Sequence, residues 1–302
     1  MHTAKPSVSV VVPVFNGIEY LRTAIDSLLA QTLQDLEIIA VDDGSTDECG
    51  DLLDRYAELH PDKLRVIHTE NRGAWEARLA GIRAARGRYV GFCDSDDVTE
   101  PEMFAKMLHR TEEGNVDLVV CAYQRLRYED GALLAVEMTR FGNQTLSVRS
   151  DPGFLLAINT ANWNKLFKAN LFNDLLEFDT PSREAQDSLL HMMTCLSCDR
   201  IAFMHEPLYR YRVRKGSLIE KSSLRDIEVL AANIRDIRAD FVKRNKDELI
   251  MEICDVMALT HIGLSLPFRQ DTAQQSSLSN IMRRVRTILD EQFPLYLNTS
   301  FT

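Results

Sequence analysis

The stretch YVGFCDSDDVTEPEMF, from Tyr89 to Phe104, joins an apolar run to three carboxylates within four residues. The apolar run ends at Cys93, and DSDD follows at positions 94–97. Carboxylates this close together repel one another unless a cation lies among them. Taken alone, the segment fits an acidic turn as well as a metal site, so the rest of the sequence has to decide between them.

Apolar runs and amphipathic runs alternate through the first hundred residues. The β-branched and apolar runs, which predict buried strands, are VSVVVPVFN (8–16), LEIIAVDDGSTD (36–47), LRVIHTE (64–70) and RYVGFCDSDD (88–97). The runs with helical spacing between them are EYLRTAIDSLLAQT (19–32), ECGDLLDRYAELH (48–60) and AWEARLAGIRAAR (74–86). This alternation predicts βαβ units with right-handed crossovers, and therefore an α/β fold with a parallel sheet.

The pattern is looser after Pro101. Helices are predicted at 101–114 and 184–196, and strands at 116–130 and 200–217. After Ser217 apolar residues recur every three or four positions, which predicts one long amphipathic helix. Two further helical stretches follow near 247–264 and 273–291. We therefore place a boundary near residue 220, with a domain at 1–220 and a helical C-terminal region at 221–302.

The composition excludes some classes of protein. The chain of 302 residues is 45% hydrophobic and 26% charged, with a formal net charge of -10, which disfavours binding to nucleic acid. No apolar run approaches the roughly 20 residues of a membrane helix. Several of the six cysteines fall in apolar segments, which favours reduced, buried thiols. We expect a cytoplasmic protein, either free or peripheral at the inner face of the membrane.

Three polar clusters follow predicted strands, where open parallel sheets bind ligands. They are PVFNGIE (13–19), DDGSTD (42–47) and DSDD (94–97). Neither of the common glycine-rich phosphate-binding loops is present. A diphosphate would instead be neutralised by a divalent metal on hard carboxylate oxygens. DDGSTD alone favours a turn that caps a helix. The three clusters together predict a binding site.

Residues 8–47 and 71–97 resemble the family 2 glycosyltransferases of the GT-A fold, which are inverting enzymes that use nucleotide-diphosphate sugars. Looser similarity continues through NWNKLF (162–167) and EPLYRYRVRKGS (206–217). The resemblance implies a GT-A nucleotide-diphospho-sugar transferase fold, which is Rossmann-like, with a mostly parallel sheet flanked by helices. It also implies a donor half at about 1–125 and an acceptor half at about 126–220.

The resemblance assigns roles to residues at the strand ends. Pro13, Phe15 and Glu19 would line the nucleoside pocket, and Asp43 would hold the base, usually uracil. DSDD matches the DXD motif of the family: Asp96 would bind Mn²⁺ or Mg²⁺ directly, and Asp94 would contact the ribose or the sugar. Arg78 would either approach phosphate and support the donor loop or make a structural salt bridge.

An inverting transfer also needs a base, which the family usually supplies from a Glu-Asp pair at the start of a helix. Asp187 stands where that Asp belongs, but Gln186 replaces the Glu. We predict Asp187 as the base and keep Glu184, one turn earlier, as the alternative. Asp187 could instead only favour the helix N-terminus electrostatically. Trp163 would form part of the acceptor floor or pack in the core.

The predicted function is metal-dependent, inverting transfer of a sugar, in polysaccharide biosynthesis. The donor would be a UDP-sugar, and the acceptor a hydroxyl of a glycan or of a lipid-linked or protein-linked glycoconjugate. The alternative is a non-catalytic member that binds nucleotide sugar or acts as a scaffold. Gln186, and Leu79 where the family has Asn, keep this alternative open. Basic patches at 243–246 and 282–286 suggest peripheral membrane contact or solvated faces, and the apolar helix faces suggest a homodimer.

Overall fold

A computed structural model describes residues 5–178, 186–213, 224–244, 246, 248–260, 262 and 275–293. The chain divides into two compact units. The first comprises Met1–Leu146, Ala161–Leu176 and Cys198–Arg214, and the second Ser147–Thr160, Glu177–Ser197 and Lys215–Thr302. The second unit therefore includes segments that the sequence analysis placed in the acceptor half, and the expected boundary near 220 stays a prediction.

The first unit is built on one sheet, which has ten strands among the described residues, in the order β3-β2-β1-β4-β9-β6-β10-β5, with β7 beside β6 and β8 beside β10. Its strands are β1 (Val8–Val14), β2 (Leu36–Asp42), β3 (Leu64–His68), β4 (Tyr89–Phe92), β5 (Val98–Thr99), β6 (Leu118–Arg127), β7 (Leu133–Glu137), β8 (Thr145–Ser147), β9 (Lys165–Lys168) and β10 (Arg200–Val213). Its helices are α1 (Ile18–Leu29), α2 (Cys49–Leu59), α3 (Ala74–Ala84), α4 (Met103–Gly114), the short α5 (Asn173–Glu177) and the 3₁₀ turns η1 (Thr139–Phe141) and η3 (Ala169–Phe172).

The four strands predicted in the first hundred residues are all present and parallel: β2 pairs with β1 and β3, and β1 pairs with β4. β9 then enters antiparallel between β4 and β6, and β10 lies parallel to β6. The register of β10 against β6 shifts around Pro207, which cannot donate a ladder hydrogen bond. The predicted α/β fold, a mostly parallel sheet flanked by helices, is confirmed.

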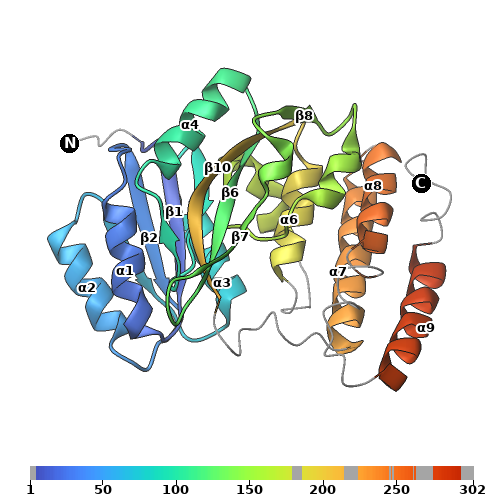
Figure 1. The fold of residues 1–302 in the computed structure, drawn as a ribbon, viewed down its shortest axis with the longest axis horizontal. Helices are drawn as coiled ribbons and strands as arrows, with labels where there is room; N and C mark the ends of the chain where they lie inside the picture. Colours follow the sequence, from blue (N-terminus) through green and yellow to red (C-terminus); the bar gives the residue numbers. More distant parts are fainter. Residues whose placement is uncertain are drawn as a thin grey trace. The chain divides into compact units, whose positions relative to one another are not determined.

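β1 explains why the sheet is covered on both faces. Val8, Val10, Val12 and Val14 belong to the core that α1 and α2 share, whereas Val11 lies against Gly81 of α3. Figure 1 shows α1 and α2 on one side of the sheet and α3 on the other. A side chain at Gly81 of α3 would place its Cβ 2.2 Å from a methyl group of Val11. The glycine therefore lets the helix approach the strand closely.

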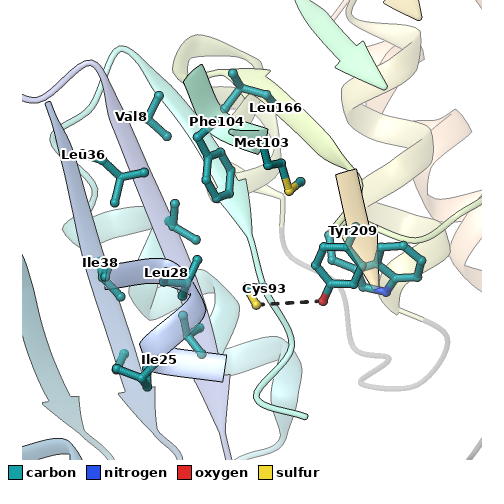
Figure 2. Packing of buried hydrophobic residues seen from close by; sticks show 14 of the residues in the cluster. Val8, Ile25, Leu28, Leu36, Ile38, Cys93, Met103, Phe104, Leu166 and Tyr209 are labelled. Atoms are coloured by element: carbon teal, nitrogen blue, oxygen red, sulfur yellow. Dashed lines mark hydrogen bonds between the residues drawn. The ribbon is translucent and has the colours of Figure 1, made fainter. Parts of the chain in front are cut away.

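The same core continues past β4 towards β10. Figure 2 shows Met103 and Phe104 of α4 packed beside Leu166 of β9, with Tyr209 of β10 near Cys93. All five side chains are fully buried. The end of β4 is thus fixed by core packing before the chain turns into DSDD.

The second unit is helical. It contains the 3₁₀ turn η2 (Pro152–Ala157) and the helices α6 (Gln186–Leu196), α7 (Leu224–Lys243), α8 (Glu248–Ala258) and α9 (Gln275–Gln292). The helices predicted at 184–196, after 217, near 247–264 and at 273–291 are therefore confirmed within the described residues. The side chains that predicted α7 by their spacing, among them Ile227, Ile234 and Phe241, are buried. In the part of the chain that the structure describes, no helix is both long and apolar enough to cross a membrane.

Candidate functional site

A cavity of about 400 Å³ opens at the carboxyl ends of β1, β2 and β4. Its walls come from the turn after β1, the first residue after β2, the start of α3 and the turn after β4. The residues that line it are Pro13, Val14, Phe15, Asn16, Gly17, Tyr20, Asp43, Ala74, Ala77, Arg78, Asp94, Ser95 and Asp96. This is the edge of the sheet where the sequence predicted a ligand.

Six of the residues that the resemblance assigned to the donor site meet in this cavity: Pro13, Phe15, Asp43, Arg78, Asp94 and Asp96. Glu19 does not line it; this residue lies exposed in the first turn of α1. The sequence analysis did not single out Asn16, Tyr20 or Ser95. Asn16 and Ser95 lie within the strand-end segments 13–19 and 94–97, which was the signal that could have identified them, whereas Tyr20 lies one residue beyond the first segment.

The turns after β1 and β2 are joined by hydrogen bonds. The backbone N–H of Asn16 donates to Ser45 Oγ at 3.0 Å, and the Thr46 N–H donates to Asn16 Oδ1 at 2.9 Å. The Ile18 N–H donates to Asp47 Oδ2 at 3.1 Å. These contacts fix the turn that carries Phe15, whose ring is half exposed at the cavity.

Asp42, at the end of β2, supports the second of these turns. Its Oδ1 accepts the Ser45 N–H at 3.0 Å, and its Oδ2 lies 2.9 Å from His68 Nδ1. The other ring nitrogen of His68 lies 3.0 Å from Asp54 Oδ1. Burial opposes ionisation of Asp42, but the bonds from Ser45 and His68 outweigh it and lower its pKa. The hydrogen bonds to Asp42 and then Asp54 raise the pKa of His68.

Asp43 is only 2% exposed. Its two carboxylate oxygens accept the backbone N–H groups of Arg72 and Gly73, at 2.9 and 2.7 Å. These groups lead into α3, so the carboxylate fixes the start of that helix and is stabilised by its dipole. Oδ1 also accepts a hydrogen bond from Thr69 Oγ1 at 3.4 Å. Oδ2 keeps a second lone pair, with which Asp43 can accept a hydrogen bond in the cavity.

DSDD forms a tight turn in which the Asp97 N–H donates to the Asp94 carbonyl at 3.1 Å. Its first three residues line the cavity, whereas Asp97 is fully buried. Arg78 Nη2 lies 3.1 Å from Asp94 Oδ1. Of the roles left open for Arg78, the structure shows the salt bridge, and it places this salt bridge in the cavity wall.

Asp97 was not distinguished by the sequence analysis. Tyr209 donates its hydroxyl hydrogen to Asp97 Oδ2 at 2.9 Å, and the backbone N–H of Arg212 donates to Oδ1 at 2.8 Å. Burial raises the pKa of Asp97 well above its usual value, and the charges of Asp96 and Asp94 add to this. One of the three carboxylates therefore points into the protein and the other two into the cavity.

The residues in the turn fit a cation that is shared with a ligand. Asp94 is paired with Arg78, and Asp96 lines the same cavity. Among the described residues, no three His, Cys, Asp or Glu side chains converge as a metal cage. Mg²⁺ in nucleotide sites is held by one or two carboxylates together with substrate phosphates, which matches this donor set.

The residues predicted for the acceptor side lie elsewhere in the chain. Asp187 is exposed on the first turn of α6, in the second unit, and Glu184 lies outside the described residues. Trp163 is 8% exposed, and its ring stacks on those of Tyr209 and Tyr211, with centroids 4.4 and 5.3 Å apart. These contacts account for the burial of Trp163, and its predicted place in the acceptor site stays a prediction.

Comparison with known proteins gives the family. The model for "Glycosyl transferase family 2" matches residues 9–172. The glycosyltransferase GlyG of Streptococcus pneumoniae is 30% identical over 94% of this chain and 97% of its own length. The uncharacterized glycosyltransferase EpsJ of Bacillus subtilis is 34% identical over 71% of this chain and 63% of EpsJ. The chain belongs to glycosyl transferase family 2.

Solved structures agree with this assignment at the level of the fold. S. aureus TarS 1-349 in complex with UDP-GlcNAc matches 96% of this chain and 83% of its own, with a TM-score of 0.73 at 19% identity. The mannosyltransferase PcManGT from Pyrobaculum calidifontis, in complex with GDP-Man and Mn²⁺, matches 99% and 83%, with a TM-score of 0.57 at 20% identity. The predicted family and GT-A fold are confirmed, and the protein is a glycosyltransferase.

Proposed function

We propose that this protein is a metal-dependent inverting glycosyltransferase that transfers a sugar from a nucleotide-diphosphate donor, with a UDP-sugar favoured, to a hydroxyl group. The acceptor would be a glycan, or a lipid-linked or protein-linked glycoconjugate. One observation carries the proposal: a single cavity holds Asp43, the Arg78–Asp94 pair and Asp96 at the carboxyl ends of parallel strands. Asp43 suits a nucleobase, the Arg78–Asp94 pair suits a diphosphate, and Asp96 suits a cation.

The structural neighbours differ in the nucleobase of the donor. TarS is described with UDP-GlcNAc and with UDP, and PcManGT with GDP-Man. Uracil and guanine both present a ring N–H, and the buried Asp43 carboxylate can accept such a bond beside those from Arg72 and Gly73. We favour UDP, in keeping with the resemblance of the sequence, and the experiment below compares four bases.

Each residue has a defined role in the proposed transfer. Asp96 would hold Mn²⁺ or Mg²⁺, whose positive charge stabilises a departing diphosphate. Arg78 keeps the Asp94 carboxylate oriented in the cavity wall. Asp187, with Glu184 as the alternative, would remove the proton from the acceptor hydroxyl, and single displacement would invert the anomeric centre.

The competing proposal is a family member that binds nucleotide sugar without transferring it. Gln186, which stands in place of the family's Glu immediately before Asp187, is the observation that favours it. The two proposals agree on donor binding and differ on turnover. A donor-binding assay followed by a transfer assay therefore separates them.

The cellular setting is also part of the proposal. All six cysteines are buried and free, as expected in the reducing cytoplasm. Three arginines of α9, Arg283, Arg284 and Arg286, are exposed, which supports contact with an anionic membrane surface near a lipid-linked acceptor. A homodimer through the C-terminal helices remains the alternative use of this region.

The test is thermal unfolding with UDP, GDP, dTDP and CDP, each in Mn²⁺ and in EDTA. A ligand at about 100 times its dissociation constant stabilises the folded state by about 2.7 kcal/mol, which is readily detected. We expect a shift with UDP that requires Mn²⁺ and is absent in Asp96→Asn. Asp62→Asn, which changes an exposed carboxylate in the turn after α2, is the matched control.

The outcomes separate the parts of the proposal. A shift with GDP in place of UDP would change the donor and leave the class intact. An equal shift in Mn²⁺ and EDTA, or an unchanged shift in Asp96→Asn, would remove the metal assignment. No shift with any nucleotide would argue for a member that has lost its donor site.

A further inference from the structure

A buried tyrosine joins the backbone of the DXD turn to the carboxylate that points inward. The backbone N–H of Asp94 donates to Tyr209 Oη at 3.1 Å, and Tyr209 donates to Asp97 Oδ2 at 2.9 Å. Both Tyr209 and Asp97 are fully buried. The turn is therefore held at its first and last residues by one side chain from β10.

The direction of each bond follows from the single hydroxyl hydrogen of tyrosine. Asp97 takes that hydrogen, since the other contact of the hydroxyl, to Cys93 Sγ, is longer at 3.9 Å (Figure 2). The lone pairs of Oη then remain to accept the Asp94 N–H. A phenylalanine at position 209 would keep the ring but remove both bonds at once.

The ring of Tyr209 is itself fixed. Trp163 stacks on it with a centroid distance of 4.4 Å and an interplanar angle of 13°. Three residues further along β10, the Arg212 N–H donates to the other oxygen of Asp97 at 2.8 Å. The turn is thus fastened to a strand that enters the sheet more than a hundred residues later in the chain.

The orientation of the turn is important because only two of its carboxylates, Asp94 and Asp96, line the cavity. Asp96 and Asp94 are both carried by the four-residue turn, and Arg78 holds the side chain of Asp94 but not its backbone. Groups that orient metal ligands from behind typically change metal affinity by about 10-fold to 100-fold when they are removed. A loose turn would hold the cation poorly, so a higher Mn²⁺ concentration would be needed for metal-dependent nucleotide binding.

We propose that Tyr209, acting with Asp97, is a positioning residue of the donor site: its hydroxyl bridges the Asp94 backbone N–H and the buried Asp97 carboxylate and so presents Asp96 to the cation. This inference rests on the proposed function, because it requires that the turn binds a divalent metal with the donor diphosphate. Asp97, the fourth residue of DSDD, would thus support the position of the other three residues.

The experiment compares Tyr209→Phe with Tyr56→Phe. Tyr56 also donates a hydrogen bond to a carboxylate, Asp26 Oδ1 at 2.5 Å, but it links α2 to α1 and lies outside the turn. For each variant, thermal unfolding with saturating UDP gives the Mn²⁺ concentration for half of the metal-dependent shift. A hydrogen-exchange measurement follows the Asp94 amide.

In Tyr209→Phe we expect half-saturation at an Mn²⁺ concentration about tenfold higher, and faster exchange at the Asp94 amide. In Tyr56→Phe the melting temperature falls, but the Mn²⁺ half-saturation stays as in the wild type. A purely structural role of Tyr209 would lower the melting temperature in the same way and leave the Mn²⁺ response unmoved, which would overturn the inference.

Two further outcomes are distinguishable. If the wild type itself shows no metal-dependent UDP binding, the proposed function fails and the inference fails with it. If Tyr209→Phe does not fold, Asp97→Asn tests the same bridge from its other end, because an amide cannot accept the Tyr209 and Arg212 hydrogens as the carboxylate does. An Mn²⁺ half-saturation in Asp97→Asn equal to that of the wild type would contradict the inference.

Discussion

Each of the two units contains a fully buried carboxyl group, and the two groups differ in their partners. Asp97 in the first unit receives hydrogen bonds from the Tyr209 hydroxyl and the Arg212 N–H and lies beside other carboxylates. Asp255 on α8 of the second unit receives a bond from Arg238 Nε of α7 at 2.9 Å. Burial raises the pKa of both groups.

The difference shows that burial and a raised pKa do not by themselves mark a functional group. Asp255 pairs with the positively charged Arg238 on the neighbouring helix, so this carboxyl group holds α7 and α8 together. Asp97 meets neutral donors, and those donors also hold the backbone of a turn that lines a cavity. The partners of a buried carboxyl group therefore distinguish a structural residue, Asp255, from a proposed positioning residue, Asp97.

The largest effect is expected in the second unit, where Asp187 is the proposed base. Asp187→Asn should lower the transfer rate by about a hundredfold or more, because an amide cannot take the acceptor proton. Metal-dependent UDP binding should stay as in the wild type, since Asp187 is not among the residues that line the donor cavity. The measurements are turnover with a radiolabelled sugar donor and the thermal shift with UDP and Mn²⁺.

Glu184→Gln is the companion variant. If it removes transfer while Asp187→Asn retains it, the base moves to Glu184. If neither variant affects transfer, both assignments are wrong. If the wild type binds donor and shows no transfer to any glycan acceptor, the non-catalytic proposal takes precedence.

The sequence predicted the donor half well because its signals are local. β-branched runs identify β1 to β4, and the acids that follow them lie at one edge because parallel strands end together. Asp94 and Asp96 could therefore be placed at the site from their position alone. Asp43 was also placed there, but its hydrogen bonds to the start of α3 were not foreseen.

The features that the sequence did not reveal depend on distant partners. Asp97 looks like its neighbours in the sequence, and its inward direction is set by Tyr209, 112 residues away. The pairing of Arg78 with Asp94 likewise depends on how α3 packs on the sheet. Glu19 shares a helical turn with the cavity residue Tyr20, yet it faces solvent, because neighbouring helix positions point in different directions.

A smaller effect, on stability alone, is expected at the Arg238–Asp255 pair. Arg238→Met leaves a buried carboxyl without its cation and should lower the free energy of unfolding by about 1–3 kcal/mol; this is less than for a fully buried pair because Arg238 is 32% exposed. Urea denaturation gives this value. Metal-dependent UDP binding should not change, in contrast to Tyr209→Phe.

Arg235→Met is the matched control, because this arginine lies on the same helix with 55% of its side chain exposed. It should change the free energy of unfolding by only a few tenths of a kcal/mol. A loss in Arg238→Met no larger than in Arg235→Met would show that the ion pair contributes little. A loss of UDP binding in Arg238→Met would contradict the distinction between Asp97 and Asp255, because the Arg238–Asp255 pair would then also affect the donor site.

The smallest effect is expected at His68, which supports the turn after β2 and has a side chain that is 48% exposed. Its bonds to Asp42 and then Asp54 raise its pKa above the ordinary value of 6.5, so the folded state binds the proton more tightly than the unfolded state. This stabilisation is fully present below pH 6.5 and is lost as the pH rises through the raised pKa. His68→Asn should therefore lower the melting temperature most at about pH 5 to 6 and least near pH 9. His109→Asn, at an exposed histidine of α4, controls for the substitution itself. If His68→Asn lowers the melting temperature by the same amount at every pH in this range, the contacts of His68 with Asp42 and Asp54 stabilise the fold without the proton.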